Sequence, residues 1–196
     1  KPVADDCITS VKAGAHDFTC GELEFRLGVP DACLEHACGV IMDVHGWFMS
    51  GTDERNETRL DQLGTDAGYI TIHPTATLAP GLLSPDPEHS WRSGVDDLLL
   101  HEFLVRTIDV FHADEDRVHL TGFSQGGAMT WRMLCAYPEL FAAVAPAGAA
   151  TGFLRIGGGG DAEGGICEGG TMPDPEVPIL FMHGTTDALS PFSVAK

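Results

Sequence analysis

Three things are scarce in this sequence: positive charge, long apolar runs and closely spaced cysteines. Only 11 residues are lysine or arginine, against 29 aspartate and glutamate residues, so the formal net charge is −18. Nucleic acid and anionic membrane surfaces are also negative and would repel such a chain. No apolar stretch reaches the length of a membrane-spanning helix. We therefore expect no nucleic-acid partner and no membrane partner.

The cysteines lack the spacing of metal-binding or redox motifs. No two of the six form a C-x-x-C pair, and no cysteine–histidine group has the spacing of a zinc site. Their order along the chain favours three disulfides over six reduced thiols: Cys7–Cys20, Cys33–Cys38 and Cys135–Cys167. Since disulfides persist in oxidising compartments, this pairing predicts a secreted or periplasmic protein, and we expect no metal.

The elements that are present alternate between strand and helix patterns. With 43% hydrophobic residues and no internal repeat, residues 1–196 are expected to form one domain with a sizeable core. Apolar runs predict strands at residues 22–29, 39–44, 69–72, 117–120, 141–146 and 177–182, of which the first alternates like an edge strand. The alternation predicts an α/β fold, with a mostly parallel sheet and helices on both faces.

Helical spacing and loop composition fill the segments between these strands. Apolar spacing predicts a helix over residues 57–67, and Ser93 with Asp96 resembles a capping box that opens another. Residues 74–93 form a long loop rich in proline, serine and glycine. Residues 151–176, with eight glycines between positions 157 and 170, cannot form regular structure and predict a mobile loop, with a flap over the site as one role.

The stretch T-G-F-S-Q-G-G at residues 121–127 stands between a predicted strand and a helical pattern that continues through residue 135. A G-x-S-x-G motif in that setting is a nucleophile elbow, which lifts its serine above the edge of the sheet. Glycine at positions 122 and 126 leaves room for the tight turn. The alternative is a chance glycine pattern, but the flanking strand and helix favour Ser124 as a nucleophile.

Other candidate residues follow two more predicted strands. Asp187 comes after residues 177–182 and could orient a general base, or could simply cap a loop. The backbone N–H groups of Gln125 and Trp47 would form an oxyanion hole, with a packing role as the alternative for Trp47. Trp91 and Trp47 could also form an aromatic wall for substrate, with loop packing as the alternative. Catalysis of this kind needs no cofactor.

Four stretches together resemble a known family: GFSQGGAM, YPELFAAVAPAGA, DVHGW and MHGTTD. They are similar to the polyhydroxybutyrate-depolymerase-like serine esterases of the α/β-hydrolase superfamily, which include feruloyl esterases, over about residues 23–191. The resemblance implies a nucleophile at Ser124, an acid at Asp187 and oxyanion donors at Trp47 and Gln125. It implies a secreted hydrolase of polyester, feruloyl or related esters. GFSQGGAM also resembles the intracellular acyl-protein thioesterase and carboxylesterase group.

One departure from the family pattern concerns the general base. The family places its catalytic histidine well after the acid, whereas all nine histidines of this sequence precede Asp187. We therefore expect that Lys196 is not the natural end, and that a C-terminal segment or a second chain supplies this histidine. A non-catalytic binding domain is the alternative that an absent base would allow.

Overall fold

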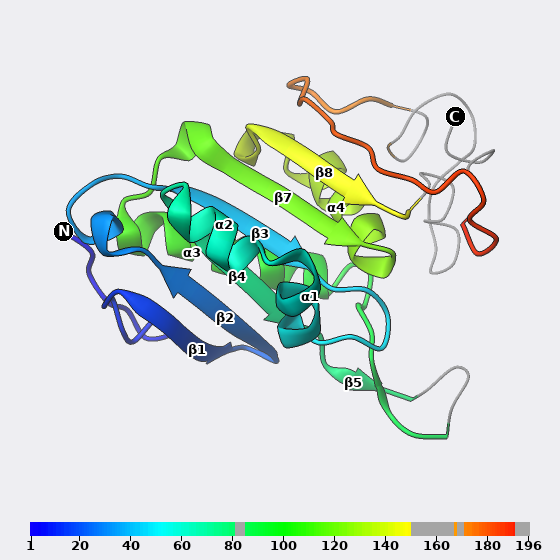
Figure 1. The fold of residues 1–196 in the computed structure, drawn as a ribbon, viewed down its shortest axis with the longest axis horizontal. Coiled ribbons are helices and arrows are strands. Elements are labelled where there is room, and N and C mark those ends of the chain that lie inside the picture. The colour runs from blue at the N-terminus through cyan, green and yellow to red at the C-terminus, as the bar shows by residue number, and fades with distance from the viewer. Residues whose placement is uncertain (81–84, 150–166, 168–170, 191–196) are drawn as a thin grey trace.

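The computed structural model describes residues 1–80, 85–149, 167 and 171–190 (Figure 1). Its central sheet has six strands in the order β1-β2-β4-β3-β7-β8. Their bounds are β1 Gly14–Cys20, β2 Leu23–Val29, β3 Gly39–Val44, β4 Tyr69–Thr75, β7 Val118–Phe123 and β8 Ala143–Ala147. The last four pair in parallel, and β1 and β2 extend the sheet antiparallel at one end. The predicted α/β fold with a mostly parallel sheet is confirmed.

Helices cover both faces of the sheet (Figure 1). Helices α1 (Gly51–Thr58) and α2 (Leu60–Asp66) lie on one face, and α3 (Asp96–Phe111) and α4 (Gln125–Ala136) on the other. The core includes the stacked rings of Phe25 and Phe103, whose centroids are 3.7 Å apart. Each such fully buried side chain contributes about 1.5–3 kcal/mol. Within the described residues, no helix is long and apolar enough to cross a membrane.

The helix predicted over residues 57–67 is confirmed only in part, because α2 covers Leu60–Asp66 and its first residues belong to another helix. The chain forms two helices, which meet at Arg59, a residue in the left-handed conformation with a φ of 57°. Helix α1 begins earlier because Ser50 and Asp53 form a reciprocal capping box. In α2 the buried position is Gly64, while Leu63 is 60% exposed, so the apolar spacing indicated the wrong face.

Two predictions about neighbouring structure are wrong. Strand β2 is not an edge strand, because β1 pairs along its whole length and covers it. Helix α3 has Val95 as its N-cap residue and no side-chain cap from Ser93. The carboxylate of Asp96 is instead fully buried and accepts hydrogen bonds from the backbone and guanidinium of Arg92. That ion pair satisfies the carboxylate that the sequence pattern assigned to a capping box.

The predicted last strand, residues 177–182, is only partly formed. It meets β8 through two isolated parallel bridges, Val144 with Ile179 and Ala147 with Met182. Leu180 is 63% exposed, in contrast to the core strands. This segment therefore extends the sheet beyond β8 without becoming a regular strand. Most of the glycine-rich stretch predicted to be mobile lies outside the described residues.

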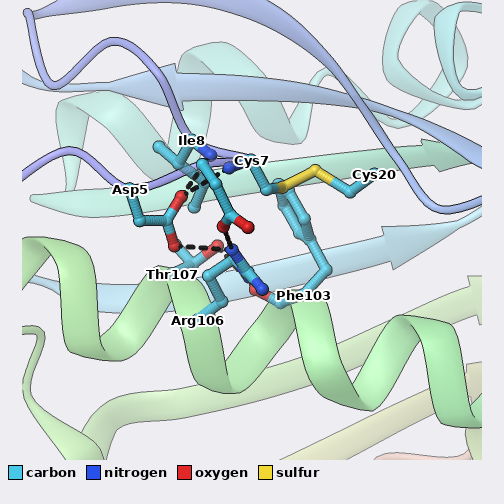
Figure 2. The surroundings of a disulfide bond; sticks show 8 residues. Asp5, Cys7, Ile8, Cys20, Phe103, Arg106 and Thr107 are labelled. Atoms are coloured by element: carbon cyan, nitrogen blue, oxygen red, sulfur yellow. Dashed lines mark hydrogen bonds and ion pairs between the residues drawn. A yellow bond between two sulfur atoms is a disulfide. The ribbon is translucent and has the colours of Figure 1, made fainter.

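The three predicted disulfides are present: Cys7–Cys20, Cys33–Cys38 and Cys135–Cys167. Figure 2 shows the first, which ties the N-terminal segment to the end of β1 above α3. The same segment is held by Arg106 of α3, which binds both Asp5 and Asp6, and by the fully buried Ile8. An otherwise irregular N-terminus is thus fixed to the core by covalent, ionic and apolar contacts.

Candidate active site

Ser124 occupies the sharp turn between β7 and α4. Its φ of 53° and ψ of −113° lie outside the usual regions for a residue with a side chain, and such strain is concentrated at functional sites. Its own N–H donates to the carbonyl of Ala147, 2.8 Å away, which fixes the turn to β8. A Cβ on Gly126 would lie 1.9 Å from the carbonyl oxygen of Val44, so this position requires glycine. The predicted elbow geometry is present, with Ser124 half-buried.

The turn after β3 presents the backbone of Trp47 to the same edge of the sheet. Gly46 accepts two hydrogen bonds on its carbonyl oxygen, from the ring of His45 at 2.6 Å and from the N–H of Met49 at 3.3 Å. In a planar trans peptide the next N–H points the opposite way, so these bonds fix the direction of the Trp47 N–H. A Cβ on Gly46 would lie 3.2 Å from the ring of Phe123, which shows that this turn packs against the elbow.

His45 organises the turn and is not a candidate base. The N–H of Ala76 donates to its Nε2 at 3.0 Å, so the proton resides on Nδ1, which donates to Gly46. Burial lowers the pKa of His45 to about 4, which keeps the ring neutral at physiological pH. The sequence offered only a His-Gly turn here and gave no signal for this role.

Trp91 and Gln125 link the long loop to the elbow. Trp91 is 6% exposed, and its indole N–H donates to the carbonyl of His45 at 2.8 Å. The side chain of Gln125 accepts from the backbone N–H of Trp91 at 3.1 Å and donates to Ser90 at 3.0 Å. Of the two roles considered for Trp91, these contacts favour packing over a substrate wall. Gln125 opens α4, where its own backbone N–H has no partner within the helix.

Exposed aromatic side chains surround the elbow. The rings of Trp47 and Phe48 stack at 4.2 Å, and Phe48 is 50% exposed. Phe123, directly before the nucleophile candidate, is 47% exposed. Phe48 also has a φ of 67°, held by a hydrogen bond from its N–H to the carbonyl of His89. The sequence patterns did not indicate Phe48 or Phe123. Phe48 directly follows Trp47, and Phe123 directly precedes Ser124.

Asp187 lies at the same, carboxyl edge of the sheet. Met182 pairs with Ala147, whose other neighbour is Phe123, so the loop carrying Asp187 begins one strand beyond β8. The Asp187 carboxylate accepts from the N–H groups of Leu189 and Ser190, both at 2.9 Å. The bond from Ser190 lowers the pKa of Asp187, which is therefore ionised. Both bonds are accepted by Oδ1, and they match the loop-cap alternative for Asp187. The other carboxylate oxygen, Oδ2, accepts neither of them.

One ring nitrogen of each histidine nearest these loops is engaged elsewhere. His89 bonds through Nδ1 to the carbonyl of Ala76 at 2.6 Å. His183 is directed at the carbonyl of Ser190 at 2.6 Å and lies 3.9 Å from Asp187. Together with the buried His45, these contacts support the expectation that the general base is none of them.

The cavity described next does not include the elbow. A cavity of about 200 Å³ lies between β2, β4 and α2, and its lining includes neither Ser124 nor the two oxyanion candidates. In the part of the chain that the structure describes, no cluster of histidine, cysteine, aspartate or glutamate could hold a metal ion. The candidate site is thus built from the turns after β3 and β7 at the sheet edge, and not from this cavity.

Comparisons with known proteins find esterases among the relatives of this chain. Feruloyl esterase B of Talaromyces stipitatus is 35% identical over 145 residues, which are 73% of this chain and 40% of that protein. Acetylxylan esterase A of Aspergillus ficuum is 28% identical over 107 residues, 54% of this chain and 35% of that protein. The solved acetyl xylan esterase from Aspergillus awamori superposes with a TM-score of 0.57 at 24% identity, covering 68% of this chain and 51% of that one. No family model matches the sequence.

The chain spans 35% to 40% of the length of these two curated relatives. The superposition shows a shared fold, and α/β-hydrolases carry their nucleophile in the turn between a strand and a helix. On its motifs, its fold and these relatives, the chain belongs to the feruloyl esterase-like family of α/β-hydrolases.

Proposed function

We propose that the protein is a serine hydrolase of carboxylic esters, with Ser124 as the nucleophile. The observation that carries this proposal is the strained backbone of Ser124 at the start of α4, beside a turn whose Trp47 N–H has a fixed direction. Strain of this kind costs about 1–3 kcal/mol and persists only where the surrounding structure holds it. The names of the curated relatives, feruloyl esterase and acetylxylan esterase, support the same reaction class.

In this mechanism the Ser124 hydroxyl attacks the ester carbonyl, and the N–H groups of Trp47 and Gln125 bind the oxygen that becomes negative. Each such donor is worth about 3–4 kcal/mol in the transition state. The alcohol leaves after taking a proton from the general base, and water then releases the acid from the acyl-enzyme. Every group acts without a metal or organic cofactor.

The acid and the base complete the triad. We assign Asp187 as the carboxylate that orients the base, because it follows the nucleophile at the same edge of the sheet. α/β-Hydrolases keep the chain order Ser, Asp, His. We therefore assign the base to a histidine of the whole protein beyond residue 196, since the histidines of this sequence precede Asp187.

For substrate, we propose feruloyl or acetyl esters, in keeping with the relatives' names. The exposed rings of Phe48 and Phe123 and the half-buried ring of Trp47 would contact the acyl group or the alcohol group. The three disulfides support an extracellular or periplasmic location, because reducing compartments do not maintain them.

The experiment compares the whole protein with its Ser124→Ala variant on p-nitrophenyl acetate and methyl ferulate. We expect a fall in kcat on the order of 10⁴-fold or more, together with loss of labelling by a fluorophosphonate probe. Ser93→Ala, which removes an exposed serine, is the matched control and should keep full activity. Equal turnover in the wild-type and Ser124→Ala proteins would remove Ser124 from the mechanism.

A further inference from the structure

A pair of buried carboxyl groups lies directly behind the turn that carries Trp47. Asp43 of β3 is 1% exposed and Glu54 of α1 is 2% exposed. Thr58 donates its hydroxyl to Asp43 Oδ2 at 2.6 Å. Asp43 Oδ1 and Glu54 Oε2 find no N–H or O–H donor among the described residues. Two buried carboxylates with unpartnered oxygens are stable only if one of them holds a proton.

The pair is connected to the candidate oxyanion turn by the chain and by the approach of Glu54 to Gly46. Asp43 lies next to the last residue of β3 and precedes His45 by two residues. The backbone N–H of Gly46 faces the carboxyl group of Glu54 and opposes the rise of its pKa. Gly46 thus has Glu54 beside its N–H, while its carbonyl accepts from His45 and Met49. A shift at Glu54 would rotate the peptide that ends in the Trp47 N–H.

The charged groups around the pair determine which carboxyl keeps the proton. Burial, Asp43 and Glu57 raise the pKa of Glu54 to about 8, while burial raises the pKa of Asp43 to about 6. On the other side His73 of β4 has its Nδ1 3.5 Å from Asp43, and burial lowers its pKa to about 4. The more distant charges facing His73 are Asp61, Arg55 and Arg26. At neutral pH a protonated Glu54 thus faces an ionised Asp43 and a neutral His73.

We propose that Glu54 and Asp43 share one proton and act as positioning residues that hold the Gly46–Trp47 peptide in the orientation that binds the oxyanion. This inference rests on the proposed ester hydrolysis. When the shared proton is lost, two buried negative charges face each other and the pair separates. The support of Gly46 is then lost, and with it one of the two oxyanion donors.

The test uses Glu54→Gln, which keeps a hydrogen-bond donor but cannot ionise. In the wild-type protein, kcat for p-nitrophenyl acetate should fall about tenfold or more as pH rises through about 8, with little change in KM. Glu54→Gln should keep its activity at pH 7 and lose this alkaline limb. Asp66→Asn, at an exposed acid of the neighbouring helix α2 that does not affect the pKa of Glu54, is the control and should keep the limb at its wild-type position.

A second measurement does not depend on activity. The amide N–H resonances of Gly46 and Trp47, followed by NMR, should titrate in the alkaline range in the wild-type protein and not in Glu54→Gln. Asp43→Asn removes the charge that raises the pKa of Glu54, so the same titration should move to lower pH. This variant also keeps the inference testable if Glu54→Gln does not fold.

The outcomes separate the two proposals. An alkaline limb and an amide titration that stay unchanged in Glu54→Gln, or a titration that stays in place in Asp43→Asn, would overturn the shared proton. Amides that titrate as expected in a protein without Ser124-dependent hydrolysis would support the shared proton and refute the proposed reaction. Loss of both the limb and the titration in an active Glu54→Gln variant supports both.

Discussion

The central sheet is held very differently at its two ends. At the β1 end, a continuous antiparallel pairing from Gly14 to Cys20 is reinforced by the Cys7–Cys20 disulfide and by Arg106 on the N-terminal segment. At the β8 end, residues 177–182 meet the sheet through two isolated bridges, and Leu189 in the loop beyond is 89% exposed. Of the proposed triad, Ser124 follows the well-packed inner strand β7, and Asp187 lies on the loosely held edge. Both lie away from the β1 end, where the disulfide and the ion pairs reinforce the sheet.

The largest expected effect comes from Asp187→Asn at the β8 end of the sheet. We expect kcat to fall on the order of 10³- to 10⁴-fold, because a neutral amide cannot stabilise the charged base. The melting temperature should change little, since the side chain is 27% exposed in a surface loop. Asp174→Asn, an exposed acid on the same edge, is the control and should leave both quantities unchanged. Full activity in Asp187→Asn would assign this residue to loop capping alone.

At the β1 end of the sheet we expect an intermediate effect, which lowers stability and leaves activity unchanged. Replacing both Cys7 and Cys20 by serine should lower the free energy of unfolding by about 3 kcal/mol, because the cross-link no longer restricts the unfolded chain. The kcat of the folded variant should be unchanged, since the disulfide lies far along the sheet from Ser124. Urea denaturation and p-nitrophenyl ester hydrolysis measure the two quantities.

The matched control is the Cys33→Ser and Cys38→Ser double variant. Its disulfide joins residues only 5 apart, so its removal should cost less. A Cys7 and Cys20 variant that is fully stable, or that is folded but inactive, would contradict the separation between the two ends.

The smallest effect at neutral pH is expected in the middle of the sheet, because it appears only in the acid range. Burial lowers the pKa of His73 to about 4 from 6.5, so the unfolded chain binds a proton that the folded protein does not. Stability is therefore complete above about pH 6.5 and falls as the pH drops towards 4, by up to about 1.4 kcal/mol per pH unit for one such group. His73→Gln should reduce this slope in denaturation curves. His36→Gln, at an exposed position, should not, and a wild-type slope in His73→Gln would rule out this contribution.

The features that were predicted correctly depend on short stretches of chain. The elbow at residues 121–127 follows from local sterics, because the turn has no room for a side chain at position 122 or 126 and both positions are glycine. The three disulfides join cysteines that are neighbours in cysteine order. The candidate residues Ser124, Trp47 and Asp187 all follow predicted strands, and parallel strands place their carboxyl ends at one edge.

The features that were missed depend on burial. The spacing of Leu60 and Leu63 indicated one amphipathic helix, but Gly64 is the residue that faces the sheet. It lies so close to the sheet that a Cβ there would be 2.6 Å from the side chain of Thr71. The pattern at Ser93 indicated a cap, but the ion pair with Arg92 determines the position of Asp96. Trp91 was considered for an aromatic wall of the substrate site. It is buried instead, and its indole N–H donates to the carbonyl of His45.

By itself, the sequence determined the fold class, the nucleophile elbow and the disulfide pairing, because each follows from steric limits or chain order within a short stretch. Only the tertiary structure decided that Glu54, Asp43 and His73 meet behind the candidate oxyanion turn. These residues come from α1, β3 and β4, and their protonation depends on being enclosed together away from water. No local pattern records which charged groups are buried against one another, since that is set only when the helices close over the sheet.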